Sequence, residues 1–464
     1  MAACLSDIRS WVSRLPADQT TFAKDISMTD RFRAVPESRL TRLAALGKLA
    51  GGVAAGFVGE GLGRLARGER PHLSDLILTP GNARRVTEQL SRLRGAAMKL
   101  GQMISLDAGD ILPSELSAIL AELRDRAHFM PQHQLEKTLE SAWGPGWRRR
   151  FNRFDMTPIA AASIGQVHRA QLASGRELAV KVQYPGVAKS IDADIDNVAT
   201  LLRMSGLLPS ALDIAPYLAE AKRQLHDEAD YLREANMMVR YQDLLRGDGR
   251  FIVPKPADGL LHPTVLPMDF LEAAPIETLI AAPQTIRNEA MGALLDLVLR
   301  ELLEFGLMQT DPNFANYRWQ KETGRIALLD FGATRVIEAE SAADYRRLLR
   351  ATLTEDVTSI RDALMTMGFV SASQATQHPH EVNEIIEIVV AQLQKSGDGI
   401  FDFADRKFVG LIRDRATSLL SDRSSWQLPS PDKLFIQRKI SGTSLLMVNM
   451  RAKLSLKQML GRYC

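Results

Sequence analysis

Residues 309–332 read QTDPNFANYRWQKETGRIALLDFG, and the interpretation of the whole chain begins from this stretch. Asn316 stands five positions after Asp311, and the triplet DFG begins at Asp330, fourteen positions after Asn316. The short apolar run 325–329 is typical of a β-strand that ends just before Asp330. Carboxylate and amide oxygens are the ligands that hard divalent cations prefer. The stretch therefore predicts a strand and two loops whose side-chain oxygens converge on a metal ion.

Kinase-like phosphotransferases use this spacing to hold a magnesium–ATP complex. In that arrangement Asp311 is the catalytic carboxylate that faces the nucleophile. Asn316 and Asp330 ligate Mg²⁺ between the phosphates. A DFG triplet alone is common by chance, so the prediction rests on the spaced set together with a lysine-bearing strand upstream.

Lys181 lies at the centre of that strand, the alternating apolar segment 177–183. A second strand is predicted at 164–172, and the turn 173–176 joins the two as a hairpin. A lysine in this position could simply face solvent. In kinase-like folds, however, the strand after the phosphate-covering loop carries the lysine that contacts the α- and β-phosphates. We therefore predict that Lys181 is catalytic and binds ATP.

The predicted phosphate-covering loop is unusual because alanines stand where glycines are expected. Glycine permits positive φ and a close approach of backbone to phosphate, whereas alanine adds a methyl group. We expect a stiffer loop in which Ser163 and Gln166 donate hydrogen bonds to the triphosphate; the alternative is the small-residue start of a helix. The loop residues predicted to contact ATP are Ala160, Ala161, Ala162, Ser163, Ile164 and Gln166.

A catalytic lysine needs an anion to hold its ammonium group. A long helix predicted at 212–245 carries three acidic candidates, Glu228, Asp230 and Glu234. On a helix, positions 230 and 234 share a face, while 228 lies well round the axis. We choose Glu234 as the partner of Lys181; the alternative for each acid is an exposed charged helix.

Six segments, in this order, resemble the UbiB/AarF-domain family of atypical kinases, close to its branch that supports coenzyme Q biosynthesis. The matching segments are KLGQ at 99–102, AAASIGQVH at 160–168, LAVKVQYPGV at 178–187, EADYLREA at 228–235, QTDPNFANY at 309–317 and LLDFGATR at 328–335. The resemblance covers about residues 35–460.

This resemblance implies an α+β, bilobal protein-kinase-like fold with a small β-containing N-lobe and a mostly helical C-lobe. It also implies an N-terminal helical extension with a KxGQ motif that folds over the active site. Lys99 and Gln102 of that motif would reach the nucleotide pocket, with Glu228 and Asp230 as their partners. From the helical pattern alone, Lys99 would be assigned to a solvent-exposed surface.

The chain divides by composition into four expected parts: a poorly ordered N-terminus, a helical extension, an N-lobe with an inserted helical pair, and a helical C-lobe. Their predicted bounds are 1–37, 38–150, 151–272 and 273–464. Glycines recur at spacings of four between 47 and 63, a pattern that lets helices approach closely. This segment could lie on a membrane surface, pack against the protein's own body or form a homodimer seam.

Composition narrows the classes of function. The chain has 464 residues, 45% hydrophobic and 24% charged, which is typical of a soluble globular protein. A net charge of +3 does not argue for nucleic acid. The two cysteines, Cys4 and Cys464, support neither a disulfide framework nor a thiolate metal site. No secretory signal is evident, and the longest uncharged apolar run, 49–59, is about half of a membrane span.

Two departures from ordinary protein kinases bear on the substrate. Gln309 stands where a histidine would precede the catalytic loop. No Ala-Pro-Glu platform follows DFG, and the chain passes almost at once into a helix predicted at 341–352. An extended activation segment normally docks a peptide, so its absence from the sequence argues against a protein substrate.

The sequence therefore predicts a magnesium- and ATP-dependent ATPase, or a kinase for a small molecule or lipid, that supports ubiquinone biosynthesis at a membrane surface. The residues expected to wall the adenine are Val167, Ala179, Met268 and Leu328, with a hinge near 269–271. Expected partners are coenzyme Q biosynthesis enzymes and lipid or quinone precursors. The expected location is the cytoplasmic side of a bacterial inner membrane, or the matrix side of a mitochondrial one.

Two other functions remain open from the sequence. The first is a nucleotide-gated scaffold or lipid chaperone for quinone-biosynthesis enzymes, with little turnover. The second is a small-molecule kinase of the aminoglycoside-phosphotransferase type, which would leave the KxGQ segment without a role.

Overall fold

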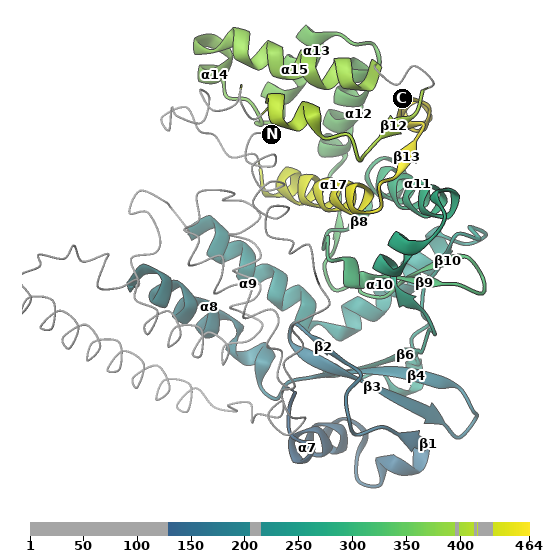
Figure 1. The fold of residues 1–464 in the computed structure, drawn as a ribbon. Helices are drawn as coiled ribbons and strands as arrows, with labels where there is room; N and C mark the ends of the chain where they lie inside the picture. The colour runs from purple at the N-terminus through teal and green to yellow at the C-terminus, as the bar shows by residue number, and fades with distance from the viewer. Residues whose placement is uncertain (1–128, 205–214, 395–398, 413–414, 416–429) are drawn as a thin grey trace, which may run out of the picture. The chain divides into compact units, whose positions relative to one another are not determined.

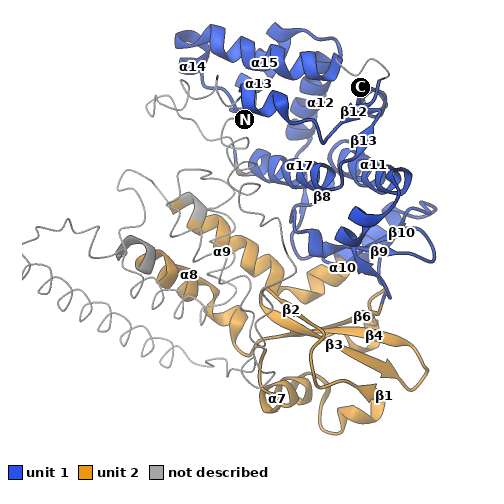
Figure 2. Cartoon of the chain, viewed as in Figure 1, with its two compact units in different colours: residues 1–14, 237–254, 271–464 blue, residues 15–236, 255–270 orange. Residues whose placement is uncertain are grey.

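The computed structural model describes residues 129–204, 215–394, 399–412, 415 and 430–464 (Figure 1). The predictions for the N-terminus and for most of the extension, including Lys99 and Gln102, lie outside these residues. The described residues belong to two compact units (Figure 2). Among described residues, unit 2 holds those up to Asn236 together with Lys255–Phe270, and unit 1 holds Met237–Pro254 and Leu271–Cys464.

Unit 2 is built on an antiparallel sheet with the strand order β1-β3-β4-β6, in which β2 also pairs with β3. The bounds are β1 (Phe151–Phe154), β2 (Ala160–Ala162), β3 (Gly165–Leu172), β4 (Glu177–Gln183) and β6 (Val265–Asp269). Gly175, at φ 87°, supplies the left-handed residue in the turn between β3 and β4. The strands predicted at 164–172 and 177–183 are confirmed within one residue, whereas β1 and β2 were not predicted.

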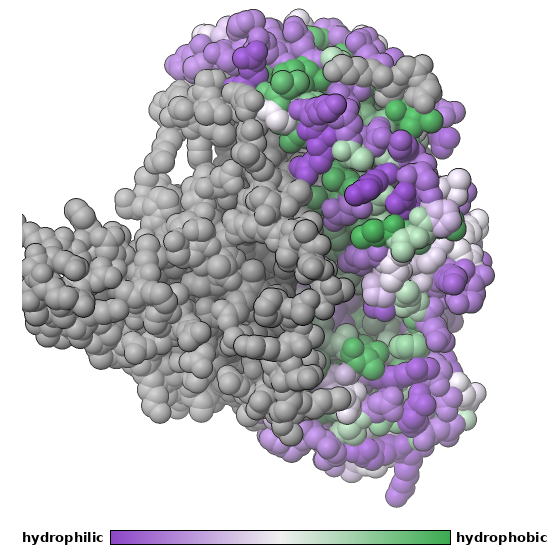
Figure 3. Space-filling model, in the orientation of Figure 1, coloured by the Kyte–Doolittle hydropathy of each residue, from purple (hydrophilic) through white to green (hydrophobic). Residues whose placement is uncertain are grey.

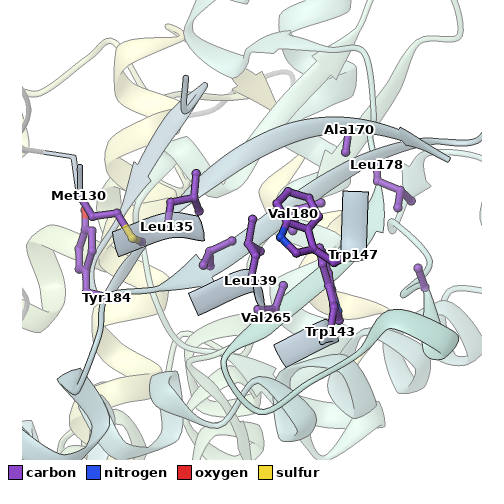
Figure 4. Packing of buried hydrophobic residues seen from close by; sticks show 12 residues of the cluster. Met130, Leu135, Leu139, Trp143, Trp147, Ala170, Leu178, Val180, Tyr184 and Val265 are labelled. Carbon is purple, nitrogen blue, oxygen red and sulfur yellow. The ribbon is translucent and has the colours of Figure 1, made fainter. Parts of the chain in front are cut away.

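One face of this sheet is closed by a helix and an aromatic cluster. Successive strand residues point to opposite faces, and Ala170, Leu178, Val180 and Val182 are all fully buried on the same side. The elements that cover them are α7 (Gln132–Trp143) and the 3₁₀ turns η3 (Trp147–Arg150) and η4 (Asp258–Leu260). Figure 4 shows Leu135, Leu139, Trp143 and Trp147 gathered with Val180 and Val265 in this core. The functional residues of the sheet must therefore use its other face.

The inserted helical pair is present. It consists of α8 (Val187–Met204) and α9 (Ala215–Ala229), and α10 (Tyr231–Leu244) follows. The ammonium of Lys222 lies 2.7 Å from the carboxylate of Asp196, which ties α9 to α8.

The single helix predicted at 212–245 is wrong, because the chain breaks at Asp230. The Asp230 carboxylate accepts a hydrogen bond from the backbone N–H of Arg233 at 2.9 Å, as an N-cap residue does. Asp230 is therefore not on one helical face with Glu234; it begins the helix that carries Glu234.

Unit 1 is mostly helical, as expected. Its helices are α11 (Gln284–Arg300), the π-helix η6 (Glu301–Phe305), α12 (Ala339–Leu353), α13 (Val357–Thr366), α14 (Ala372–Gln377), α15 (Pro379–Gln394), α17 (Pro431–Asn449) and α18 (Leu456–Gly461), with the 3₁₀ turns η5 (Ile276–Ala281) and η7 (Phe314–Asn316). Apolar faces of α12, α13 and α15 form one core around Ile360, Leu364 and Ile386.

Three small sheets connect these helices. Their strands are β5 (Phe251–Ile252), β10 (Arg325–Leu328), β9 (Tyr317–Gln320) and β7 (Ala274–Pro275) in one sheet, β8 (Leu307–Gln309) with β11 (Thr334–Val336), and β12 (Phe401–Asp402) with β13 (Lys453–Leu454). The β12–β13 pair shows that the helical C-lobe predicted for 273–464 also contains strands near its end. The β8–β11 and β9–β10 pairs matter most, because the catalytic-loop and DFG segments emerge from their ends.

Among the helices of the described residues, none combines the length and hydropathy needed to cross a bilayer. On the face drawn in Figure 3, hydrophilic side chains cover most of the described surface, and hydrophobic ones lie in small separate groups.

Candidate functional site

The ion pair predicted between Lys181 and Glu234 is present in unit 2. Lys181 Nζ lies 3.0 Å from both carboxylate oxygens of Glu234. Lys181 is 7% exposed and Glu234 is fully buried. The ammonium also lies 5.3 Å from the centroid of the Tyr231 ring, where the aromatic face attracts a cation. The sheet and α10 therefore hold the lysine head in one place.

Strand register groups the predicted adenine residues of unit 2 with this lysine. Directly opposite residues of antiparallel strands point to the same face, and Val167 is opposite Lys181 while Ala179 is opposite Met268. Lys181 and Ala179 are two positions apart on β4 and so also share that face. Val167, Ala179, Lys181 and Met268 thus lie on the face opposite the α7 core. Their contact with a nucleotide stays a prediction.

The alanine-rich segment is a tight hairpin rather than an open loop. Ala160–Ala162 form β2, and Ala162 pairs with Gly165, which leaves Ser163 and Ile164 as the two turn residues. A Cβ on Gly165 would lie 2.4 Å from the carbonyl oxygen of Val182. Only glycine fits there, so the backbone of the hairpin packs directly against the backbone of β4. The side chain of Ile164 is 2% exposed, so it points into the unit rather than toward a ligand.

The prediction that Gln166 donates to phosphate is wrong. Its side chain is fully buried on the α7 side of the sheet. Gln166 Oε1 accepts a hydrogen bond from the Met130 N–H at 2.8 Å, and its Nε2 lies 2.9 Å from His168 Nε2. The alternation of β3 places position 166 on the opposite face from Val167, so this amide anchors the chain that leads into α7.

The candidates Asp311 and Asn316 lie in unit 1, in the segment between β8 and β9. Asn316 Nδ2 donates to Asp311 Oδ2 at 3.1 Å, which leaves the amide oxygen of Asn316 outside this bond. The Asn313 N–H bonds Asp311 Oδ1 at 3.3 Å, and Asn313 Oδ1 accepts from the Ala315 N–H at 3.1 Å. These short-range bonds shape the loop and bring Asp311 and Asn316 together.

Backbone pairing brings the DFG segment to the same place. The Leu329 N–H donates to the Asn316 carbonyl at 3.1 Å, and the Thr310 N–H and Oγ1 both donate to the Ala333 carbonyl, at 3.2 and 2.8 Å. In sequence, Asp330 lies between Leu329 and Ala333, the two residues that make these hydrogen bonds. Its Oδ1 accepts a hydrogen bond from the Gly332 N–H at 2.9 Å. Hydrogen bonds therefore hold the backbone on both sides of Asp330 beside the loop that carries Asp311 and Asn316, within one unit. Adenine candidate Leu328 immediately precedes this segment on β10 and is 5% exposed.

This donor set fits a hard cation. Its atoms are carboxylate and amide oxygens, the ligands that Mg²⁺ selects. Among the described residues, no group of three or more His, Cys, Asp or Glu side chains could hold a metal on its own. The Asp330 carboxylate and the Asn316 amide would leave most coordination positions of Mg²⁺ to phosphate oxygens and water, as is usual for Mg²⁺ in phosphoryl-transfer enzymes.

The remaining predicted ligands are only partly described. Glu228 is half-buried near the end of α9, and Asp230 is exposed at the start of α10. Because Lys99 and Gln102 lie outside the described residues, their pairing with these acids stays a prediction.

One buried lysine that contacts the residues flanking the catalytic loop was not predicted from the sequence. Lys439 of α17 is 1% exposed, and its ammonium contacts Gln309 and Tyr317. A signal was available, because Ile436, Lys439, Thr443 and Leu446 recur at helical spacing along one stripe. A lysine within such a stripe must have buried partners.

Comparisons with known proteins identify the family of this chain. The ABC1 atypical kinase-like domain matches residues 122–364. The atypical kinase COQ8, mitochondrial, of Saccharomyces cerevisiae is 36% identical over 424 residues, covering 90% of this chain and 83% of that protein. The mitochondrial atypical kinase COQ8B of Rattus norvegicus is 34% identical, covering 94% of this chain and 82% of its own length.

A solved structure supports the fold. Rv3197 of Mycobacterium tuberculosis, determined as a complex with erythromycin, is similar with a TM-score of 0.57 and 24% identity. The match covers 81% of this chain and 93% of that one. The expected α+β kinase-like fold is confirmed. With the family match across more than half of the chain, these findings show that the chain belongs to the ABC1 atypical kinase family, the UbiB/AarF group that its motifs resemble.

Proposed function

We propose that this chain is a magnesium-dependent, ATP-binding atypical kinase or ATPase that acts in ubiquinone biosynthesis. The proposal is supported by the hydrogen bonds that join Asn316 to Asp311 and hold the DFG segment beside their loop within unit 1. The relatives named atypical kinase COQ8 support the coenzyme Q pathway as its setting.

Each residue then has a definite task. Lys181 binds the α- and β-phosphates, and Glu234 orients its ammonium. Asp311 faces the attacking nucleophile and accepts its proton. Asn316 and Asp330 hold Mg²⁺, which neutralises charge on the phosphate oxygens when bound. The pocket for the adenine ring is lined by Val167, Ala179 and Met268.

The acceptor that best suits this chain is a lipid or a phenolic small molecule. In unit 1 only β11 separates the DFG triplet from α12, so the segment that would dock a peptide is short. A lipid precursor places the enzyme at the periphery of a membrane, on the cytoplasmic side in a bacterium or the matrix side in a mitochondrion. Enzymes of the same pathway are its expected partners.

The test is hydrolysis of Mg·ATP by the purified full chain, with and without a phenolic or lipid activator. Asp330→Asn keeps the shape of the side chain but removes a metal-ligating charge. We expect it to lower turnover at least about 100-fold, the scale of losing a main electrostatic contribution to the transition state. Asp362→Asn is the matched control, because Asp362 is 64% exposed in the same unit.

Asp330→Asn with wild-type nucleotide binding and turnover would show that the metal assignment is wrong. Tight Mg·ATP binding without turnover in the wild-type chain, coupled to nucleotide-dependent capture of quinone-biosynthesis enzymes, would instead support the scaffold function. Phosphate transfer to a soluble acceptor in the absence of any membrane would favour an aminoglycoside-kinase-like activity.

A further inference from the structure

A buried lysine lies behind the loop that carries Asp311. The Lys439 ammonium donates to Gln309 Oε1 at 3.0 Å and to the Tyr317 hydroxyl at 2.5 Å. It also lies 3.9 Å from Glu301 Oε2. Burying an ammonium is costly unless it is paired and hydrogen-bonded, so this arrangement needs all three partners.

The hydrogen-bonding partners of Lys439 flank the loop. Gln309 is the last residue of β8, and Tyr317 is the first residue of β9. Residues 310–316, with Asp311 and Asn316, form the connection between them. One ammonium therefore bonds the side chains at both ends of the catalytic loop and fixes their separation.

Glu301 completes the network from the π-helix. Glu301 Oε1 accepts from the Tyr241 hydroxyl at 2.6 Å and from the Gln309 N–H at 3.2 Å. Burial raises the pKa of Glu301, while Lys439 opposes that rise. Burial lowers the pKa of Lys439, but Glu301 and Tyr317 outweigh it and hold that pKa above its ordinary value. The lysine is charged at neutral pH, and the charge of Asp311 also acts on it.

The same face of α17 supports both loops of the site. A Cβ on Gly442 would lie 2.2 Å from Cβ of Pro312, so the helix touches the catalytic loop itself. One turn before Lys439, the Phe435 ring lies 3.7 Å from the guanidinium carbon of Arg335, which follows the DFG segment. Phe435, Lys439 and Gly442 are spaced at four and three residues and share this face.

We propose that Lys439 is a positioning residue that sets the geometry of residues 310–316 through its bonds to Gln309 and Tyr317. The predicted loss of kcat rests on the proposed function. The predicted change in the structure of residues 310–316 does not. Lys439 touches neither substrate nor metal; it acts through the loop that carries Asp311 and Asn316. The competing explanation is that Lys439 only neutralises the buried Glu301.

A charge-compensated pair of variants separates these explanations. Lys439→Met removes the bonds to the loop and leaves Glu301 buried without its cation. The double variant Lys439→Met with Glu301→Gln removes both charges and keeps an acceptor for Tyr241 and Gln309. Lys433→Met is the matched control. Lys433 is also on α17, but its ammonium lies 2.8 Å from the buried carboxylate of Asp344, which belongs to α12 and not to the catalytic loop.

The readouts are hydrogen exchange of residues 310–316 without nucleotide, and kcat and KM for Mg·ATP corrected for the folded fraction. We expect both Lys439 variants to exchange faster in this segment. We also expect them to lose about 10- to 100-fold in kcat, with KM for ATP within about twofold, because small misplacement of reacting groups acts on the chemical step. Lys433→Met should lose thermal stability and keep kcat.

Restoration of loop protection and kcat in the double variant would overturn the proposal in favour of charge neutralisation. Equal exchange rates in all variants would also overturn it. If the wild-type chain shows no turnover, the proposed function fails, and exchange in 310–316 still decides the role of Lys439.

Discussion

His168 makes the β3 strand sensitive to acid. The neutral ring satisfies both neighbours if Nδ1–H donates to the Asp155 carbonyl, 2.8 Å away, and Nε2 accepts from Gln166. Burial lowers the pKa of His168 from 6.5 to about 4, although Asp155 opposes the shift. Between these two pKa values His168 is mostly neutral in the folded chain and mostly protonated in the unfolded chain.

The stability that depends on neutral His168 is present above pH 6.5 and is lost as the pH falls toward 4. A shift of this size corresponds to about 3 kcal/mol of unfolding free energy. We expect His168→Gln to show a smaller loss between pH 7 and pH 4 than the wild type, measured by urea unfolding. His133→Gln, on the exposed side of α7, is the control. Equal losses in wild type and His168→Gln would contradict the argument.

At the scale of an element, α17 tolerates no side chain where it meets the catalytic loop. A methyl group on Gly442 would overlap Pro312 Cβ. We expect Gly442→Ala to lower the unfolding free energy by about 1–3 kcal/mol, the usual cost of overpacking. Because the strain falls on the loop with Asp311, kcat should fall as well. Thermal unfolding and Mg·ATP hydrolysis measure the two effects.

Gly292 of α11 provides the comparison. A Cβ there would lie 3.6 Å from Leu454 Cδ2, an ordinary contact. Alanine in a helix interior is favoured over glycine by about 0.5–1 kcal/mol, so Gly292→Ala should be neutral or stabilising and fully active. A stable, active Gly442→Ala variant would show that α17 yields at this contact and does not constrain the loop.

At the scale of the whole molecule, the proposed function assigns phosphate contacts to Lys181 of unit 2 and metal contacts to Asp330 of unit 1. A ligand that binds only the folded state at 100 times its Kd stabilises that state by about 2.7 kcal/mol. We expect Mg·ATP to raise the thermal midpoint and to slow hydrogen exchange near Lys181 and near Asp330 together. ATP with EDTA should protect less, since the metal contacts are lost. Protection confined to one unit would contradict a shared nucleotide.

Much of the fold follows from local patterns. Alternating apolar residues predict β3 and β4, because a strand buries every second side chain. The spacing of Asp311 and Asn316 predicts their contact, because two residues five positions apart in a loop closed by its own hydrogen bonds need few contacts with distant segments. The pairing of Lys181 with Glu234 also follows, because the motif order matches a known arrangement.

Other features depend on partners far along the chain. The pattern of β3 shows two faces but not which one α7 covers, so Gln166 was assigned to the wrong side. The break between α9 and α10 arises because the Asp230 side chain bonds the backbone at the start of α10, although the pattern of the surrounding sequence favours one continuous helix. Lys439 and Gln309 are 130 residues apart, and only packing of α17 behind the loop brings them together. Periodicity and short spacings therefore predict β3, β4 and β10, the order of the motifs and the donor atoms. Which face of β3 is covered and which groups lie behind the catalytic loop depend on packing between segments far apart in the chain, because long-range burial selects those partners.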